Sequence, residues 1–182
     1  HTLQEYSMYE RTGEAYELDE KLTVLGPKLQ PGNVAPEFVL DSFDGNTMST
    51  VGLADTAGHV RLLNVINSLD TPVCNIETRK WDRLRSDLPP DTVIYTVSMD
   101  LPYAQARWQT AEGVSHAALS AHKNEQFATN YGVLLKEWRL LQRAVFVIDH
   151  RGIITYAEYV SDQMKEPNYN AAVEAVREAT RV

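Results

Sequence analysis

LLNVINSLDTPVC, residues 62–74, joins a predicted strand to a predicted helix. The apolar run that ends at Ile66 is typical of a buried strand. Thr71 and Pro72 then predict a helix start, because threonine is a good N-cap residue and proline is favoured at the first helical position. Cys74 becomes the third helical residue, where unpaired backbone N–H groups and the positive end of the helix dipole favour thiolate over thiol. Since the thiolate is the nucleophile, this stretch predicts a reaction site.

Cys74 is the one cysteine of the chain, and a lone cysteine has a second interpretation. Free cysteines are among the most buried residue types, and most act as small inert hydrophobes. An inert cysteine has no need of a threonine-proline helix start just before it. The local pattern therefore favours a reactive Cys74.

The composition is that of a folded domain with an acidic surface. The 182 residues are enough for one domain with a sizeable core. The net charge of −8, with acidic and basic residues interleaved, argues against nucleic acid and anionic membranes as partners. No apolar run has the length of a membrane span, and no signal-peptide pattern opens the chain. A single cysteine excludes an internal disulfide and fits a reducing compartment, so we expect a cytoplasmic protein.

Hydrophobic patterns and turn residues predict the order of strands and helices along the chain. The expected strands are residues 14–18, 22–25, 38–40, 61–67, 92–98, 144–149 and 153–159. The expected helices are residues 72–88, 102–112, 125–131 and 168–180, the first stopped by Pro89-Pro90. Residues 19–21, 44–46 and 150–152 are turns that would close three hairpins. A β-α-β half followed by a β-β-α half resembles the thioredoxin fold. The predicted class is α/β, with a mixed central sheet flanked by helices and an N-terminal β-hairpin extension.

Several separated motifs in this order resemble the thiol peroxidase branch of the peroxiredoxins. They are DTPVC at 70–74, SMDLPYAQARW at 98–108, RAVFVID at 143–149, YAEYV at 156–160 and EPNY at 166–169. The likeness runs from about Leu18 to the C-terminus, so it implies a peroxiredoxin domain over residues 18–182. Residues 1–17 are then a partly irregular N-terminal extension, in which residues 1–7 look irregular and Met8 is a candidate natural start.

The resemblance implies a reaction and three site residues. It implies reduction of hydrogen peroxide or a small organic hydroperoxide, with Cys74 as the peroxidatic nucleophile that becomes a sulfenic acid. It implies that the Thr71 hydroxyl hydrogen-bonds the sulfur or the peroxide, although Thr71 could also be a plain helix cap. It implies that Arg143 lends positive charge to the thiolate and the peroxide, whereas the spacing alone favours a solvated charge at a strand end. A homodimer without a cofactor is expected.

Two positions depart from the family pattern. Asn67 stands where family members usually carry a proline, and it could leave Cys74 more open or supply a hydrogen bond instead. Gln109 occupies the position after Trp108 where many relatives have a resolving cysteine. Without that cysteine, the sulfenic acid must be reduced by a low-molecular-weight thiol, a thioredoxin-like protein, or Cys74 of a second subunit.

Other functions have weaker support in the sequence. A metal site is not expected, because His116, His122 and His150 lack ligand spacing and one cysteine cannot anchor a soft metal. A Cys-His hydrolase would need a histidine beside the sulfur, and only His116 lies in the middle of the chain. Two alternatives remain open: a peroxide-sensing thioredoxin-like module that relays oxidation to a partner protein, and a binding domain with an unreactive Cys74.

Overall fold

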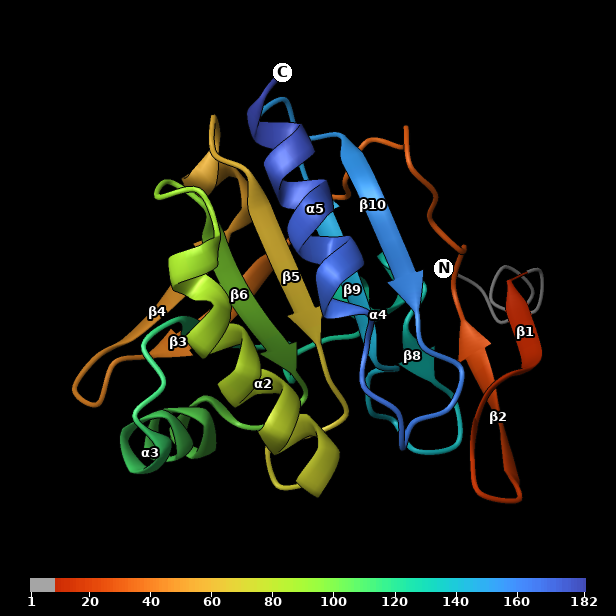
Figure 1. The fold of residues 1–182 in the computed structure, drawn as a ribbon. Helices are drawn as coiled ribbons and strands as arrows, with labels where there is room; N and C mark the ends of the chain where they lie inside the picture. Colours follow the sequence, from red (N-terminus) through yellow and green to blue (C-terminus); the bar gives the residue numbers. More distant parts are fainter. Residues whose placement is uncertain (1–8) are drawn as a thin grey trace.

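A seven-stranded mixed sheet forms the centre of the computed structural model, which describes residues 9–182 (Figure 1). Its strand order is β10-β9-β5-β6-β7-β3-β4. The strands are β3 (Val39–Phe43), β4 (Met48–Gly52), β5 (Arg61–Val65), β6 (Val93–Ser98), β7 (Ala117–Ser120), β9 (Ala144–Ile148) and β10 (Ile154–Tyr159). β5 pairs parallel with β6 and antiparallel with β9. This arrangement confirms the predicted α/β class and the central position of the strand before Cys74.

Helices cover both faces of this sheet. The helices are α2 (Pro72–Leu84), α3 (Pro102–Glu112), α4 (Gln126–Asn130) and α5 (Tyr169–Thr180), with short 3₁₀ turns at Leu53–Thr56 and Arg85–Asp87. Figure 1 shows α2 and α5 side by side on one face. Successive side chains of β5 point to opposite faces, so Leu62 packs under α2 and α5 with Trp81, whereas Leu63 joins the opposite core with Phe127.

Three predicted hairpins are present. β3 and β4 pair across the Asp44 turn, and β9 pairs with β10 across Gly152. β1 (Glu10–Glu17) and β2 (Glu20–Leu25) form the N-terminal hairpin, with β1 starting four residues earlier than predicted. That hairpin lies in a separate three-stranded sheet of order β1-β2-β8, where β8 is Leu134–Leu135. The irregular stretch predicted for residues 1–7, and Met8 after it, lie outside the described residues.

The prediction of one helix over residues 72–88 is wrong at its C-terminal end. α2 stops at Leu84, a 3₁₀ turn follows, and Leu88 has extended dihedrals of φ −94° and ψ 154°. Proline disfavours helical dihedrals in the preceding residue, so Pro89 keeps Leu88 extended. The Leu88 side chain is then buried in the core under α2 and α5. The strands β7 and β8 were not predicted, and β4 was implied only by the hairpin turn expected at residues 44–46.

The other helix boundaries follow their end signals. α3 begins at Pro102 and ends before Gly113, whose φ of 67° is the left-handed conformation that glycine adopts at low cost. α5 begins after Asn168, whose side chain accepts a hydrogen bond from the Ala171 amide. Within residues 9–182, none of the helices is both long enough and apolar enough to span a bilayer.

Candidate active site

A short loop between β5 and α2 delivers Cys74 to the first turn of the helix. The loop leaves the sheet with Ile66, whose amide donates to the Val97 carbonyl at 3.0 Å. Farther along, the Ser68 hydroxyl and the Leu69 amide both donate to the Asp100 carboxylate, at 2.7 and 2.9 Å. The loop is therefore fixed to the end of β6, the parallel neighbour of β5.

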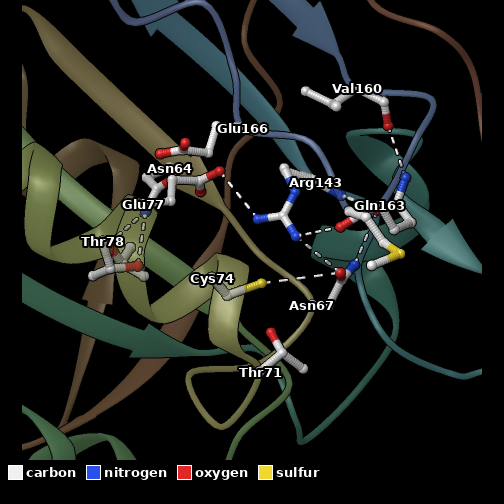
Figure 2. Close-up of polar contacts among 12 residues, drawn as sticks. Asn64, Asn67, Thr71, Cys74, Glu77, Thr78, Arg143, Val160, Gln163 and Glu166 are labelled. Atoms are coloured by element: carbon white, nitrogen blue, oxygen red, sulfur yellow. Dashed lines mark hydrogen bonds and ion pairs between the residues drawn. The ribbon is translucent and has the colours of Figure 1, made fainter. Parts of the chain in front are cut away.

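Cys74 is the third residue of α2, as predicted, and its side chain has no exposed surface. Ile66, Leu69 and the partly buried Trp108 surround the sulfur with apolar groups. The polar contact of the sulfur is with Asn67: Sγ donates to Oδ1 over 3.9 Å (Figure 2). Burial by itself fits an inert cysteine as well as a reactive one, so the neighbouring charges decide between the two interpretations.

Thr71 takes the N-cap position, but its side chain does not cap the helix. The hydroxyl donates backward to the Ser68 carbonyl at 2.9 Å, and it accepts no bond from the first turn of α2. The first helical bond runs instead from the Asn75 amide to the Thr71 carbonyl. The side-chain cap predicted for Thr71 is therefore wrong, because the tight turn at Ser68 uses the hydroxyl. Within residues 9–182, no hydrogen bond joins Thr71 to the sulfur of Cys74, although the two lie on the same turn (Figure 2).

Arg143 is buried at the start of β9, with 1 % of its surface exposed. Its Nη2 donates to the Gln163 carbonyl at 2.6 Å and to Asn67 Oδ1 at 3.4 Å. Burial on its own would lower the pKa of Arg143, but attraction to Glu77 and to Cys74 raises it above the ordinary value. The guanidinium thus stays charged beside the sulfur, and the interpretation of Arg143 as a solvated charge is wrong.

Glu77 is a site residue that the sequence analysis missed. It lies one turn after Cys74 on the same face of α2, is fully buried, and accepts a bond from Arg143 Nη1 at 3.1 Å. Burial raises the pKa of this carboxyl, and Arg143 opposes part of the rise. The spacing of three residues from Cys74 could have placed Glu77 near the sulfur, since positions i and i+3 of a helix are neighbours.

Gln163, in the loop after β10, was also missed. Its Oε1 accepts from the Arg143 amide at 2.9 Å and from Asn67 Nδ2 at 3.1 Å (Figure 2). Asn67 Nδ2 donates in addition to the Leu141 carbonyl at 2.6 Å. Of the two possibilities for Asn67, the structure therefore has the hydrogen-bonding one, and the fully buried Cys74 excludes the more open site.

The remaining candidates lie away from the sulfur or bind other groups. Gln109, in the position of the resolving cysteine, donates to the His116 carbonyl at 2.6 Å from α3. The His116 ring contacts the Thr96 hydroxyl at 2.7 Å and Asp82 at 3.2 Å, which gives no support to a Cys-His pair. In the described part of the chain, no group of three or more His, Cys, Asp or Glu side chains could hold a metal ion.

The family match, the sequence relatives and the solved structures that resemble this chain agree with one another. Residues 31–157 match the AhpC/TSA family. The chain is 44 % identical over 161 residues to a thiol peroxidase of Streptococcus sanguinis, covering 88 % of this chain and 96 % of that protein. It is 41 % identical to a thiol peroxidase of Bacillus subtilis, covering 86 % and 92 %. The solved structure of a peroxiredoxin-like protein from Aquifex aeolicus aligns with a TM-score of 0.81 and 32 % identity, covering 94 % of this chain and 99 % of that one.

Proposed function

The chain belongs to the AhpC/TSA family, and we propose that it is a thiol-dependent peroxidase that reduces hydrogen peroxide or a small organic hydroperoxide through Cys74. The observation that carries this proposal is the buried Arg143 guanidinium, which shares the acceptor Asn67 Oδ1 with the Cys74 sulfur on the first turn of α2. A fixed positive charge and the helix N-terminus both favour the thiolate.

In the proposed reaction, the Cys74 thiolate attacks the terminal oxygen of the peroxide. The S–O bond forms as the O–O bond breaks, so the sulfur is oxidised to a sulfenic acid and the peroxide is reduced to water or an alcohol after it takes up a proton. Negative charge develops on the departing oxygen, and Arg143 is the group that stabilises it there. The Thr71 hydroxyl, now bonded to Ser68, would turn toward the bound peroxide.

The second half of the reaction needs a thiol from outside the chain. With one cysteine, the sulfenic acid has no internal partner. A first thiol attacks the sulfenic sulfur and releases water, and a second thiol then frees Cys74 from the mixed disulfide. A low-molecular-weight thiol and a thioredoxin-like protein both fit this role. Because the sulfur has no exposed surface, the first turn of α2 has to open before either reductant can reach it.

The proposal is tested by mixing the reduced protein with hydrogen peroxide in a stopped-flow instrument and following tryptophan fluorescence. Trp108 packs against the Cys74 cluster and is the expected reporter. We expect oxidation many orders of magnitude faster than that of a free thiol, no such phase in Cys74→Ser, and repeated turnover with an added thiol. A rate like that of free cysteine would overturn the proposal. Fast oxidation without turnover with either class of thiol would favour a peroxide-sensing module that relays oxidation to a partner.

We also propose a cytoplasmic homodimer. Support for the dimer comes from exposed apolar side chains near the site: Ile76 on α2, and Leu101 and Tyr103 at the start of α3, each 51–59 % exposed. α2 and α3 follow parallel neighbouring strands, so their first turns leave the same edge of the sheet. Sedimentation should give twice the mass of the chain, and Tyr103→Glu should lower it to that of one chain. Cell fractionation tests the location.

A further inference from the structure

The orientation of the Asn67 amide is fixed by acceptors on one of its sides. Nδ2 donates to the Leu141 carbonyl at 2.6 Å and to Gln163 Oε1 at 3.1 Å. Rotating the amide by half a turn would place Oδ1 against these two acceptors, which have no proton to give. Both amide protons of Asn67 are therefore committed to the side away from Cys74.

Gln163 cannot relieve this constraint, because backbone groups fix its own amide. Its Nε2 donates to the Val160 carbonyl at 2.8 Å and to the Ser161 carbonyl at 2.9 Å. Its Oε1 must then face the Arg143 amide, from which it accepts at 2.9 Å, and Asn67 Nδ2 (Figure 2). Three backbone carbonyls, those of Leu141, Val160 and Ser161, thus determine which end of Asn67 points at the sulfur.

The end that points at the sulfur is a carbonyl oxygen. Asn67 Oδ1 lies 3.9 Å from Cys74 Sγ and 3.4 Å from Arg143 Nη2. A carbonyl oxygen accepts a hydrogen bond from a thiol but has no proton with which to bond a thiolate, so it favours the protonated sulfur. It also accepts from Nη2 of the Arg143 guanidinium, whose other hydrogen bonds go to Glu77 and to the Gln163 carbonyl.

The charged groups near this network come from several elements. They are Arg143 before β9, Glu77 on α2, Glu158 on β10 and Glu166 in the loop after it, which both act on Glu77, and Asp100 after β6, which is bonded to Ser68 and Leu69. Arg143 is attracted to the sulfur and also donates to Asn67 Oδ1, the oxygen that accepts from Cys74 Sγ. Asn67 is therefore positioned to change the balance between thiol and thiolate.

We propose that Asn67 is a positioning residue that restrains the ionisation of Cys74 and divides the Arg143 guanidinium between itself and the sulfur. The effect of Asn67 on the protonation of Cys74 is inferred from its contacts alone. Its consequence for peroxide reduction, a slower reaction at pH values where the thiol predominates, rests on the proposed function.

Two substitutions at this position test the proposal in opposite directions. Asn67→Leu removes the acceptor at similar volume, and we expect the pH midpoint of Cys74 ionisation to fall by about one unit, a tenfold increase in the thiolate-to-thiol ratio below the midpoint. Asn67→Asp adds a negative charge beside the sulfur, and the midpoint should rise. The readout is the ultraviolet absorbance of the thiolate, with Cys74→Ser subtracted to remove the signal of tyrosine ionisation.

Asn64→Leu is the matched control, because Asn64 is equally buried on β5 but bonds Thr78 and Thr96 instead of the sulfur. Its midpoint should equal that of the unmodified chain, with circular dichroism confirming that all variants are folded. Shifts of the same sign in Asn67→Leu and Asn67→Asp, or no shift in either, would overturn the proposal. Opposite shifts in a chain that fails to reduce peroxide would support it and overturn the proposed function instead.

Discussion

Asp100 holds Ser68 in place across two parallel strands: the Ser68 hydroxyl donates to the Asp100 carboxylate at 2.7 Å. The second carboxylate oxygen of Asp100 accepts from the Leu69 amide at 2.9 Å and from the Ser98 hydroxyl at 2.7 Å. One side chain therefore binds both the loop that precedes Cys74 and the strand beside it. Since Ser68 in turn accepts from the Thr71 hydroxyl through its carbonyl, the position of Thr71 also depends on Asp100.

Asp100→Ala should loosen this loop. The substitution leaves the Leu69 amide and two hydroxyls without their acceptor, and hydrogen bonds to a charged group contribute about 2 kcal/mol. We expect the free energy of unfolding to fall by at least that amount, hydrogen exchange at the Leu69 amide to accelerate, and the rate of Cys74 oxidation to drop. Urea unfolding, exchange measurements and stopped-flow fluorescence report these three quantities.

Asp44→Ala is the control for this prediction. Asp44 also accepts backbone N–H groups, from Asn46 and Thr47, but does so in the turn between β3 and β4. The Asp44→Ala substitution should leave the rate of Cys74 oxidation unchanged. An equal loss of rate in the two variants would show that Asp100 does not act through the Cys74 loop.

Arg143→Lys should slow peroxide reduction although it keeps the positive charge. The guanidinium reaches three acceptors at once, namely Glu77, Gln163 and Asn67, and a lysine ammonium on a flexible chain cannot reproduce that fork. Removing one well-placed donor from a developing negative charge costs about 10²-fold or more in rate. We expect a loss of this size in the second-order rate constant with hydrogen peroxide.

Arg151→Lys provides the comparison. Arg151 pairs with Asp149 at 2.9 Å in the turn between β9 and β10, and its side chain is 60 % exposed. The Arg151→Lys variant should react with peroxide as the unmodified chain does. If Arg143→Lys also keeps the full rate, charge alone is sufficient at this position and the fork geometry has no role.

Local signals in the sequence predicted the strand, loop and helix that present Cys74. Apolar runs, the proline at a helix start and glycine at turns act over a few residues, and the ends of α3 and the hairpin at Gly152 follow from them. β7 was missed because Ala117–Ser120 has no β-branched residue, and it is a strand through its pairing with β6.

Local signals in the sequence could not predict the polar network around Cys74. Asn67 bonds Gln163, which is 96 positions away in the sequence, and Arg143 bonds Glu77, which is 66 positions away. No short motif encodes such pairs, because the sheet order brings β5, β9 and the loop after β10 together. The resemblance supplied Arg143, but it gave no indication that Asn67 and Gln163 would be bonded to one another.

The lack of a resolving cysteine should make Cys74 prone to over-oxidation. A sulfenic acid that no internal thiol captures stays open to a second peroxide, which converts it to a sulfinic acid. Excess hydrogen peroxide without a reductant should therefore give a sulfinic product on the peptide that contains Cys74, and an added low-molecular-weight thiol should suppress it. Mass spectrometry of that peptide separates this product from methionine oxidation elsewhere. A chain that keeps only sulfenic acid under excess peroxide would contradict the prediction.

His116 should make the fold sensitive to acid. Burial lowers the pKa of His116 to about 4, while Asp82 opposes this and Arg85 adds to it. The unfolded chain binds this proton near the ordinary histidine value of about 6.5. Between these two values the unfolded state holds more protons, so the free energy of unfolding rises with pH there. The stabilisation is fully present above about pH 6.5 and is lost as the pH falls through 4, at most about 3 kcal/mol.

His116→Gln removes this proton while an amide can still bond the Thr96 hydroxyl. Urea unfolding at several pH values between 4 and 7 should give a steep fall in stability for the unmodified chain and a flatter curve for the variant. His59→Gln changes an exposed histidine that bonds the Asp91 carbonyl, and its curve should run parallel to that of the unmodified chain. If all three curves are parallel, His116 does not bind a proton on unfolding in this range.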